Sequence, residues 1–228
     1  MNQNHSAVAS RESVSVLATN KVLRNTYMLL SMTLLFSAVM AVISMTLAQT
    51  VGLPPMTGLL TIGGAIALMF FVLPKVANST KGVGVVFLIT GLLGFGLGPM
   101  LMMYAGLSNG GEVIGLAMGG TGVIFLGLSG YVLTTRKDFS FMGGFLMVGI
   151  LLAIIAMVAN LFFNIPALSL MISSVVIMIM SGFILYDTSR IIHGGETNYV
   201  LATMGLYLTI FNIFVHLLSI LGIMGGDD

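Results

Sequence analysis

The stretch PALSLMISSVVIMIMSGFILYD, residues 166–187, contains no charged residue before Asp187 at its end. An α-helix needs about 20 predominantly apolar residues to cross the hydrocarbon core of a bilayer. This run therefore predicts a membrane-spanning helix. Its last residue raises a second question, because a carboxylate at the end of such a helix either lies in water or turns towards neighbouring helices.

The composition extends this prediction to the whole chain. Of its 228 residues, 57% are hydrophobic and 7% are charged, and the mean hydropathy is +1.11. Soluble domains carry about 25% charged residues, so the chain is a polytopic membrane protein. The net charge of +1 gives no indication of a nucleic-acid partner, and the absence of cysteine excludes disulfides and thiolate metal sites.

Seven apolar runs are long enough to cross a bilayer, which predicts an all-α integral membrane protein. The expected spans are 26–48, 56–74, 82–104, 112–134, 141–163, 166–187 and 200–224. Only NIP separates the fifth span from the sixth, and we expect Asn164 to cap a tight hairpin and Pro166 to begin the next helix. The expected domains are a polar N-terminal tail (1–25), the helical bundle (26–224) and a short C-terminal tail (225–228).

The basic residues predict the orientation of the bundle. All eight lie before the first expected span or in every second loop: Arg11, Lys21, Arg24, Lys75, Lys81, Arg136, Lys137 and Arg190. The opposite loops contain none. Because loops rich in Lys and Arg stay in the cytoplasm, we expect a cytoplasmic N-terminus and, with an odd number of spans, a periplasmic C-terminus.

The last span carries a polar stripe. Thr209, Asn212, His216 and Ser219 are spaced 3, 4 and 3 residues apart, which places them on one helical face. Polar groups facing lipid would be unsatisfied, so this face is expected to point into the bundle. It either makes hydrogen bonds between helices or lines a hydrated or ion-conducting path.

Asp187 has two possible environments. About 30 Å along its helix at 1.5 Å per residue, it lies at the cytoplasmic boundary. There it either pairs in water with Arg190, three residues on, or faces the bundle interior near Thr209 or Asn212. The following loop contributes His193 and Glu196, which do not make a metal-ligand set. We find no arrangement typical of an enzyme, a metal site or a cofactor site.

Glycines predict close helix contacts in two further spans. Gly94 and Gly98 are four residues apart, as are Gly115 and Gly119. Small residues at this spacing let helix backbones approach closely in lipid.

Four stretches together resemble the Bax inhibitor-1 (TMBIM) family: NKVLRNTYMLLSMTLLFSA, YVLTTRKDFSFMGGFLMVGI, ILYDTSRIIHGGETNYV and LYLTIFNIFVHLLSILG. The resemblance covers about residues 21–222. It implies a seven-helix bundle with the last helix near the centre, in the inner membrane of a bacterium. One branch of the family binds and restrains the membrane protease FtsH and is also its substrate. Other members conduct cations, notably calcium, under the control of a pair of acids.

The acid pair is only half present in this chain. Asp187 occupies the first acid position of the family, whereas the second falls on Thr209; Asn212 fits the asparagine that follows. Without a second carboxylate, the mutual repulsion that separates the pKa values of an acid pair is missing. We therefore expect a non-enzymatic FtsH modulator whose partners are the lipid bilayer and FtsH. The alternatives are a pH-sensitive leak channel for protons or calcium ions and a purely structural membrane partner.

Overall fold

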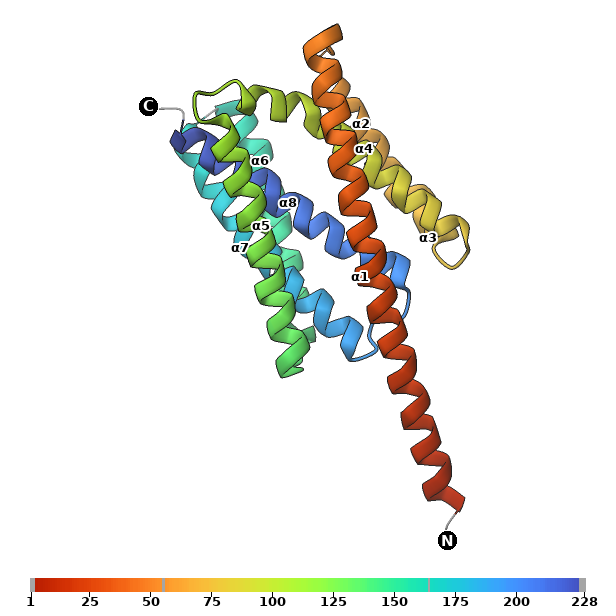
Figure 1. Cartoon of the computed structure of the whole chain (residues 1–228). Coiled ribbons are helices and arrows are strands. Elements are labelled where there is room, and N and C mark those ends of the chain that lie inside the picture. The colour runs from red at the N-terminus through yellow and green to blue at the C-terminus, as the bar shows by residue number, and fades with distance from the viewer. Residues whose placement is uncertain (1–2, 55, 164, 226–228) are drawn as a thin grey trace.

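Seven membrane spans form the molecule (Figure 1). The computed structural model describes residues 3–54, 56–163 and 165–225, with side chains for all of these except 3–16 and 18. Its helices are α1 (Gln3–Val51), α2 (Met56–Ala67), η1 (Leu68–Val72), α3 (Leu73–Val76), α4 (Lys81–Ala105), α5 (Gly110–Thr135), η2 (Ser140–Met142), α6 (Gly143–Phe163), α7 (Pro166–Ile192) and α8 (Tyr199–Gly225). Each of the seven predicted spans lies within one helix that is long and apolar enough to cross a membrane, so the predicted fold class is confirmed.

The first helix is longer than the bilayer requires. α1 runs without a break from Gln3, through the predicted end of the tail at residue 25, to Val51. Its N-terminal part projects beyond the other helices in Figure 1. Of the expected C-terminal tail, Gly225 ends α8 and residues 226–228 lie outside the described part of the chain.

The second span contains a π-helical turn. The helix is α-helical to Ala67, π-helical over Leu68–Val72 and α-helical again to Val76. Pro74 lies two residues after this turn, and proline has no N–H to donate to the carbonyl four residues earlier. A π-turn is one way in which a helix accommodates such a lost hydrogen bond.

A tight hairpin joins the fifth and sixth spans, as predicted. Pro166 is the first residue of α7 and Ile165 is its N-cap, in an extended conformation. Asn160 holds the turn from the end of α6, because its side chain accepts a hydrogen bond from the Ile165 N–H (3.1 Å) and donates one to Ser169 Oγ (2.7 Å). The predicted cap, Asn164, lies outside the described residues.

The spans form two groups that α8 connects. In one group α4 packs against α1 and α2, and in the other α7 packs against α5 and α6. α8 contacts α1 and α4 on one side and α5 and α7 on the other, and it runs obliquely behind the space between α1 and α5 in Figure 1. This position agrees with the expectation of a last helix near the centre, although α4 buries the largest share of its residues.

The two glycine pairs differ in what surrounds them. A β-carbon at Gly94 would lie 2.2 Å from the Ser37 backbone oxygen, and one at Gly98 would lie 2.1 Å from Ser44 Oγ. The prediction of close packing is therefore correct for α4, which meets α1 at these glycines. It is wrong for α5, because β-carbons at Gly115 and Gly119 would meet no atom within 4 Å.

Candidate functional site

Asp187 lies where α7 meets α8. Its side chain is partly buried, and a β-carbon added at Gly205 of α8 would lie 3.2 Å from Asp187 Oδ2. The absence of a side chain at Gly205 thus lets the carboxylate approach the backbone of α8. The contact lies one helical turn before Thr209, one of the two neighbours that we expected for Asp187.

Arg190 is oriented away from Asp187 and towards the loop that follows α7. Its guanidinium pairs with the Glu196 carboxylate at 3.6 Å and donates a hydrogen bond to the Gly195 carbonyl at 3.1 Å. It also lies over the Tyr186 ring, 5.5 Å from the ring centroid. Among the residues that the structure describes, Asp187 forms no ion pair.

The polar stripe of α8 does not form a continuous hydrogen-bonded path through the described side chains. Thr209 is buried and donates to the Gly205 carbonyl (3.1 Å), and Asn212 donates to the Leu208 carbonyl (2.8 Å). Both bonds stay within α8. His216 does reach another helix, since its Nδ1 lies 3.1 Å from Ser173 Oγ of α7.

A second set of polar contacts was not predicted. Tyr207 of α8 is 1% exposed; its hydroxyl donates to the Thr90 carbonyl of α4 (3.3 Å) and lies 2.6 Å from Ser37 Oγ of α1. Because a phenol has one hydrogen to donate, Ser37 must be the donor of the shorter bond. The sequence offered one signal, since a tyrosine within an apolar span needs a partner for its hydroxyl.

Three more contacts extend this set towards the end of the bundle where α8 begins. The Tyr27 hydroxyl of α1 bonds Ser129 Oγ of α5 and lies 3.5 Å from Thr188 Oγ1 of α7. Thr203 Oγ1 of α8 donates to the Tyr199 carbonyl of its own helix (2.7 Å) and also lies 3.2 Å from the Thr26 carbonyl of α1. Together with the Tyr207 contacts, they form what we call the polar seam, which joins the α1–α4 group to α5, α7 and α8.

The loop between α5 and α6 is fastened to the end of α7. His193 Nε2 lies 3.1 Å from the Arg136 carbonyl, and the Phe139 N–H donates to Ser189 Oγ (2.9 Å). Asp138 Oδ1 accepts hydrogen bonds from the hydroxyl and the N–H of Ser140 (2.5 and 2.8 Å), which lowers the pKa of the Asp138 carboxyl below its ordinary value.

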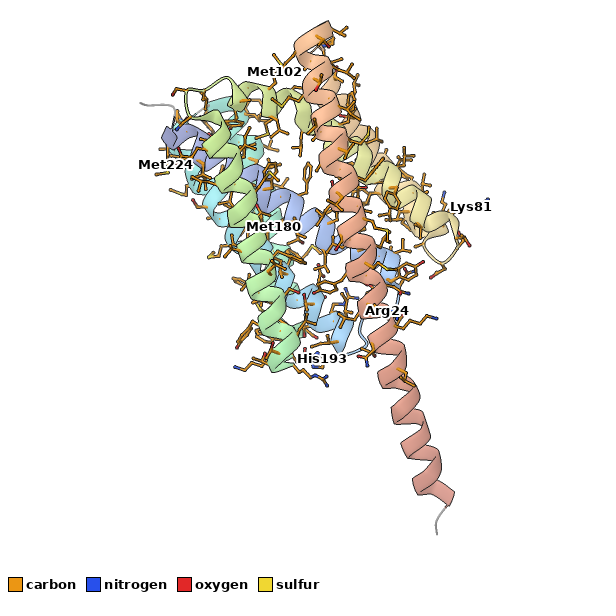
Figure 2. All side chains as sticks on the ribbon, in the orientation of Figure 1. Arg24, Lys81, Met102, Met180, His193 and Met224 are labelled. Atoms are coloured by element: carbon orange, nitrogen blue, oxygen red, sulfur yellow. The ribbon has the colours of Figure 1, made fainter. Side chains whose placement is uncertain are left out.

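The candidate site residues therefore divide between two places. Arg190, His193 and Glu196 lie at the end of the bundle, where Figure 2 shows His193 on the same side as Arg24 and far from Met102 and Met224. Asp187, Thr209, Asn212 and His216 lie along the α7–α8 interface. Within the described residues no group of three or more His, Asp or Glu side chains comes together to hold a metal ion.

Comparison with known proteins identifies relatives over the whole length of the fold. The family model for the inhibitor of apoptosis-promoting Bax1 matches residues 19–226. This range includes all seven spans, and the predicted resemblance is confirmed.

Individual relatives come from several bacteria. The chain is 54% identical over 221 residues to the modulator of FtsH protease YccA from Escherichia coli K12, covering 96% of this chain and 97% of that protein. The same protein from E. coli O6:H1 is named an inner membrane protein. An uncharacterized membrane protein of Vibrio cholerae is 51% identical over 93% of both chains.

Proposed function

The chain belongs to the Bax inhibitor-1 family, and we propose that it is a bacterial inner-membrane protein that binds FtsH and modulates its proteolytic activity. The observation that carries the proposal is the 54% identity to a protein named as a modulator of FtsH, which extends over 96% of this chain. The identity extends over nearly the whole length of both proteins.

The architecture is compatible with action by direct contact. The described loops are short, and the largest of them connect helix ends without a domain of their own. A modulator of this shape reaches a membrane protease with its lipid-facing helices, its loops or the projecting part of α1. The last of these is the largest surface outside the bundle in Figure 1.

The proposed orientation places this projecting part in the cytoplasm. The expected cytoplasmic end carries the loops at 77–80, 136–139 and 193–198, which contain basic residues or are flanked by them on the adjoining helix ends. We propose that residues 1–25 are both a contact for FtsH and the segment that the protease grips when it degrades the protein.

The experiment is an affinity purification of the tagged protein from native membranes, combined with measurement of turnover. FtsH should co-purify, and overproduction should lengthen the half-life of a membrane substrate of FtsH. Deletion of residues 2–15 should slow degradation of the protein itself and leave membrane insertion unchanged. Deletion of residues 226–228, on the opposite side, serves as the control and should leave turnover as it is.

Two results would contradict the proposal. Absence of FtsH from the purified material, with unchanged substrate half-life, would favour a structural role. Normal turnover of the truncated protein would exclude the N-terminal segment as the part that the protease grips, even if binding were intact.

A further inference from the structure

An apolar groove lies between α1 and α5. These two helices flank α8, and their backbones stay apart within the described residues, although the side chains of Tyr27 of α1 and Ser129 of α5 meet through a hydrogen bond. The space between them has a volume of about 450 Å³. Its lining residues come from α1, α4, α5 and α8.

The lining determines the chemistry of what the groove can hold. It is apolar except for the hydroxyls of Ser37, Thr121 and Tyr207. Ser37 and Tyr207 bond each other at 2.6 Å, and Thr121 donates to the Ala117 carbonyl of its own helix at 2.7 Å. Because each of these hydroxyls already has a partner, an occupant gains nothing from polar groups of its own. The apolar lining therefore favours a hydrocarbon as the occupant of the groove.

The groove opens within the membrane-spanning part of the molecule. All its lining residues belong to four of the apolar spans. The lining side chains Val42 of α1 and Met118 of α5 are 61% and 59% exposed, respectively. The medium at this depth is lipid, and an empty apolar space would forfeit the dispersion contacts of its lining.

The size of the groove fits a small apolar ligand. A flexible hydrocarbon chain can enter without moving either helix. A volume of about 450 Å³ is also within the usual range for small-molecule pockets, roughly 300–1,000 Å³.

We propose that this groove is a binding site for one acyl chain of a membrane phospholipid, held between α1 and α5 above Tyr207. The bound chain contacts both groups of helices where the protein itself leaves them apart, and it shields the Ser37–Tyr207 hydrogen bond of the polar seam. The acyl-chain site does not depend on FtsH binding, so a negative result for either proposal leaves the other unaffected.

Glycines of α5 allow a matched test. Gly122 lines the groove, Gly119 does not, and a β-carbon at either position would meet no atom within 4 Å. Gly122→Leu therefore fills the groove, whereas Gly119→Leu adds the same side chain elsewhere on the same helix. Equal melting temperatures of the two variants in detergent would show that both are folded.

The full-length protein is reconstituted in phosphatidylcholine vesicles with a trace of phosphatidylcholine that carries a photoactivatable diazirine in one acyl chain. After illumination, mass spectrometry locates the labelled residues. We expect label on Phe211 and Phe214 of the groove and on the lipid-facing Phe162 of α6. In Gly122→Leu the groove label should be lost and the α6 label retained; in Gly119→Leu both should remain.

Groove labelling that is unchanged in Gly122→Leu, or absent from the wild-type protein, would overturn the proposal. So would labelling of the groove by a diazirine fatty acid but not by the phospholipid. Cross-links from Phe211 to another polypeptide in native membranes would identify the occupant as a helix of a partner instead.

Discussion

At the scale of single residues, Asp187 and Arg190 lie three positions apart on α7 but have different environments. Arg190 pairs with Glu196 in the loop, and Asp187 faces Gly205 across the interface with α8. The resemblance to the family located the acid at position 187, and the apolar run before it showed that the residue is unusual. Neither could show that the carboxylate approaches the backbone of α8 at Gly205, because that depends on how two helices separated by a loop are aligned.

This environment leads to a prediction for Asp187→Asn. The family's second acid position holds Thr209 here, so no pair of carboxylates shares a proton and titration of Asp187 should be a single step. We expect the variant to change stability modestly, by about 1 kcal/mol, and not to open a large cation path. Calcium-sensitive dye in proteoliposomes at several pH values, and thermal unfolding in detergent, measure the two effects.

Arg190→Gln is the control for the loss of a charge at the same end of α7. It breaks the pair with Glu196 (3.6 Å) and leaves the Asp187–Gly205 contact in place. A strongly pH-dependent calcium flux in the wild-type protein that disappears in Asp187→Asn but persists in Arg190→Gln would contradict the prediction and favour the leak-channel alternative.

At the scale of helices, the sequence predicts more about each element than about its neighbours. The seven spans follow from apolar runs because bilayer thickness sets their length. Ser37 and Tyr207, which bond each other across 170 positions of sequence, could not be paired in this way, since their meeting depends on how α1 and α8 cross. Glycine spacing was informative for α4 and misleading for α5, because the same pattern arises whether or not another helix covers it.

The difference between the two glycine pairs is testable. Gly94→Ala and Gly98→Ala would each place a β-carbon within 2.3 Å of α1, at 2.2 and 2.1 Å from Ser37 and Ser44 atoms. Such overpacking forces α1 and α4 apart and should cost about 1–3 kcal/mol. Gly115→Ala and Gly119→Ala meet open space and should be neutral or should stabilise α5 by about 0.5–1 kcal/mol.

Unfolding by sodium dodecyl sulfate in mixed micelles, followed by circular dichroism, gives the free energies of unfolding for all four glycine variants. Equal losses of stability in the two pairs would show that α5 is covered by another helix in the membrane. Unchanged stability of Gly94→Ala would show that α1 and α4 do not approach closely at that glycine.

At the scale of the whole molecule, α1 begins and α8 ends at opposite ends of the bundle (Figure 1). This is the arrangement that an odd number of spans requires. The loops at 77–80, 136–139 and 193–198 lie between spans two and three, four and five, and six and seven, so a single end of the bundle carries them all. The distribution of charge relative to these loops then decides which end faces the cytoplasm.

We predict that the C-terminus is periplasmic. All eight Lys and Arg residues belong to the N-terminal segment, to those three loops or to the helix ends beside them. The reverse orientation would require every one of them to cross the membrane during insertion, against the bias that sets topology.

Alkaline phosphatase fused after Asp228 should be active and green fluorescent protein at the same point should be dark, because the first folds in the periplasm and the second in the cytoplasm. Fusions after Ser79, in the loop before α4, should show the opposite pattern. A fluorescent Asp228 fusion would mean that one of the seven apolar helices does not cross or that the bundle is inverted. Unchanged Ser79 fusions would then assign the failure to one of the last five spans, because inversion or failure of one of the first two spans would reverse them.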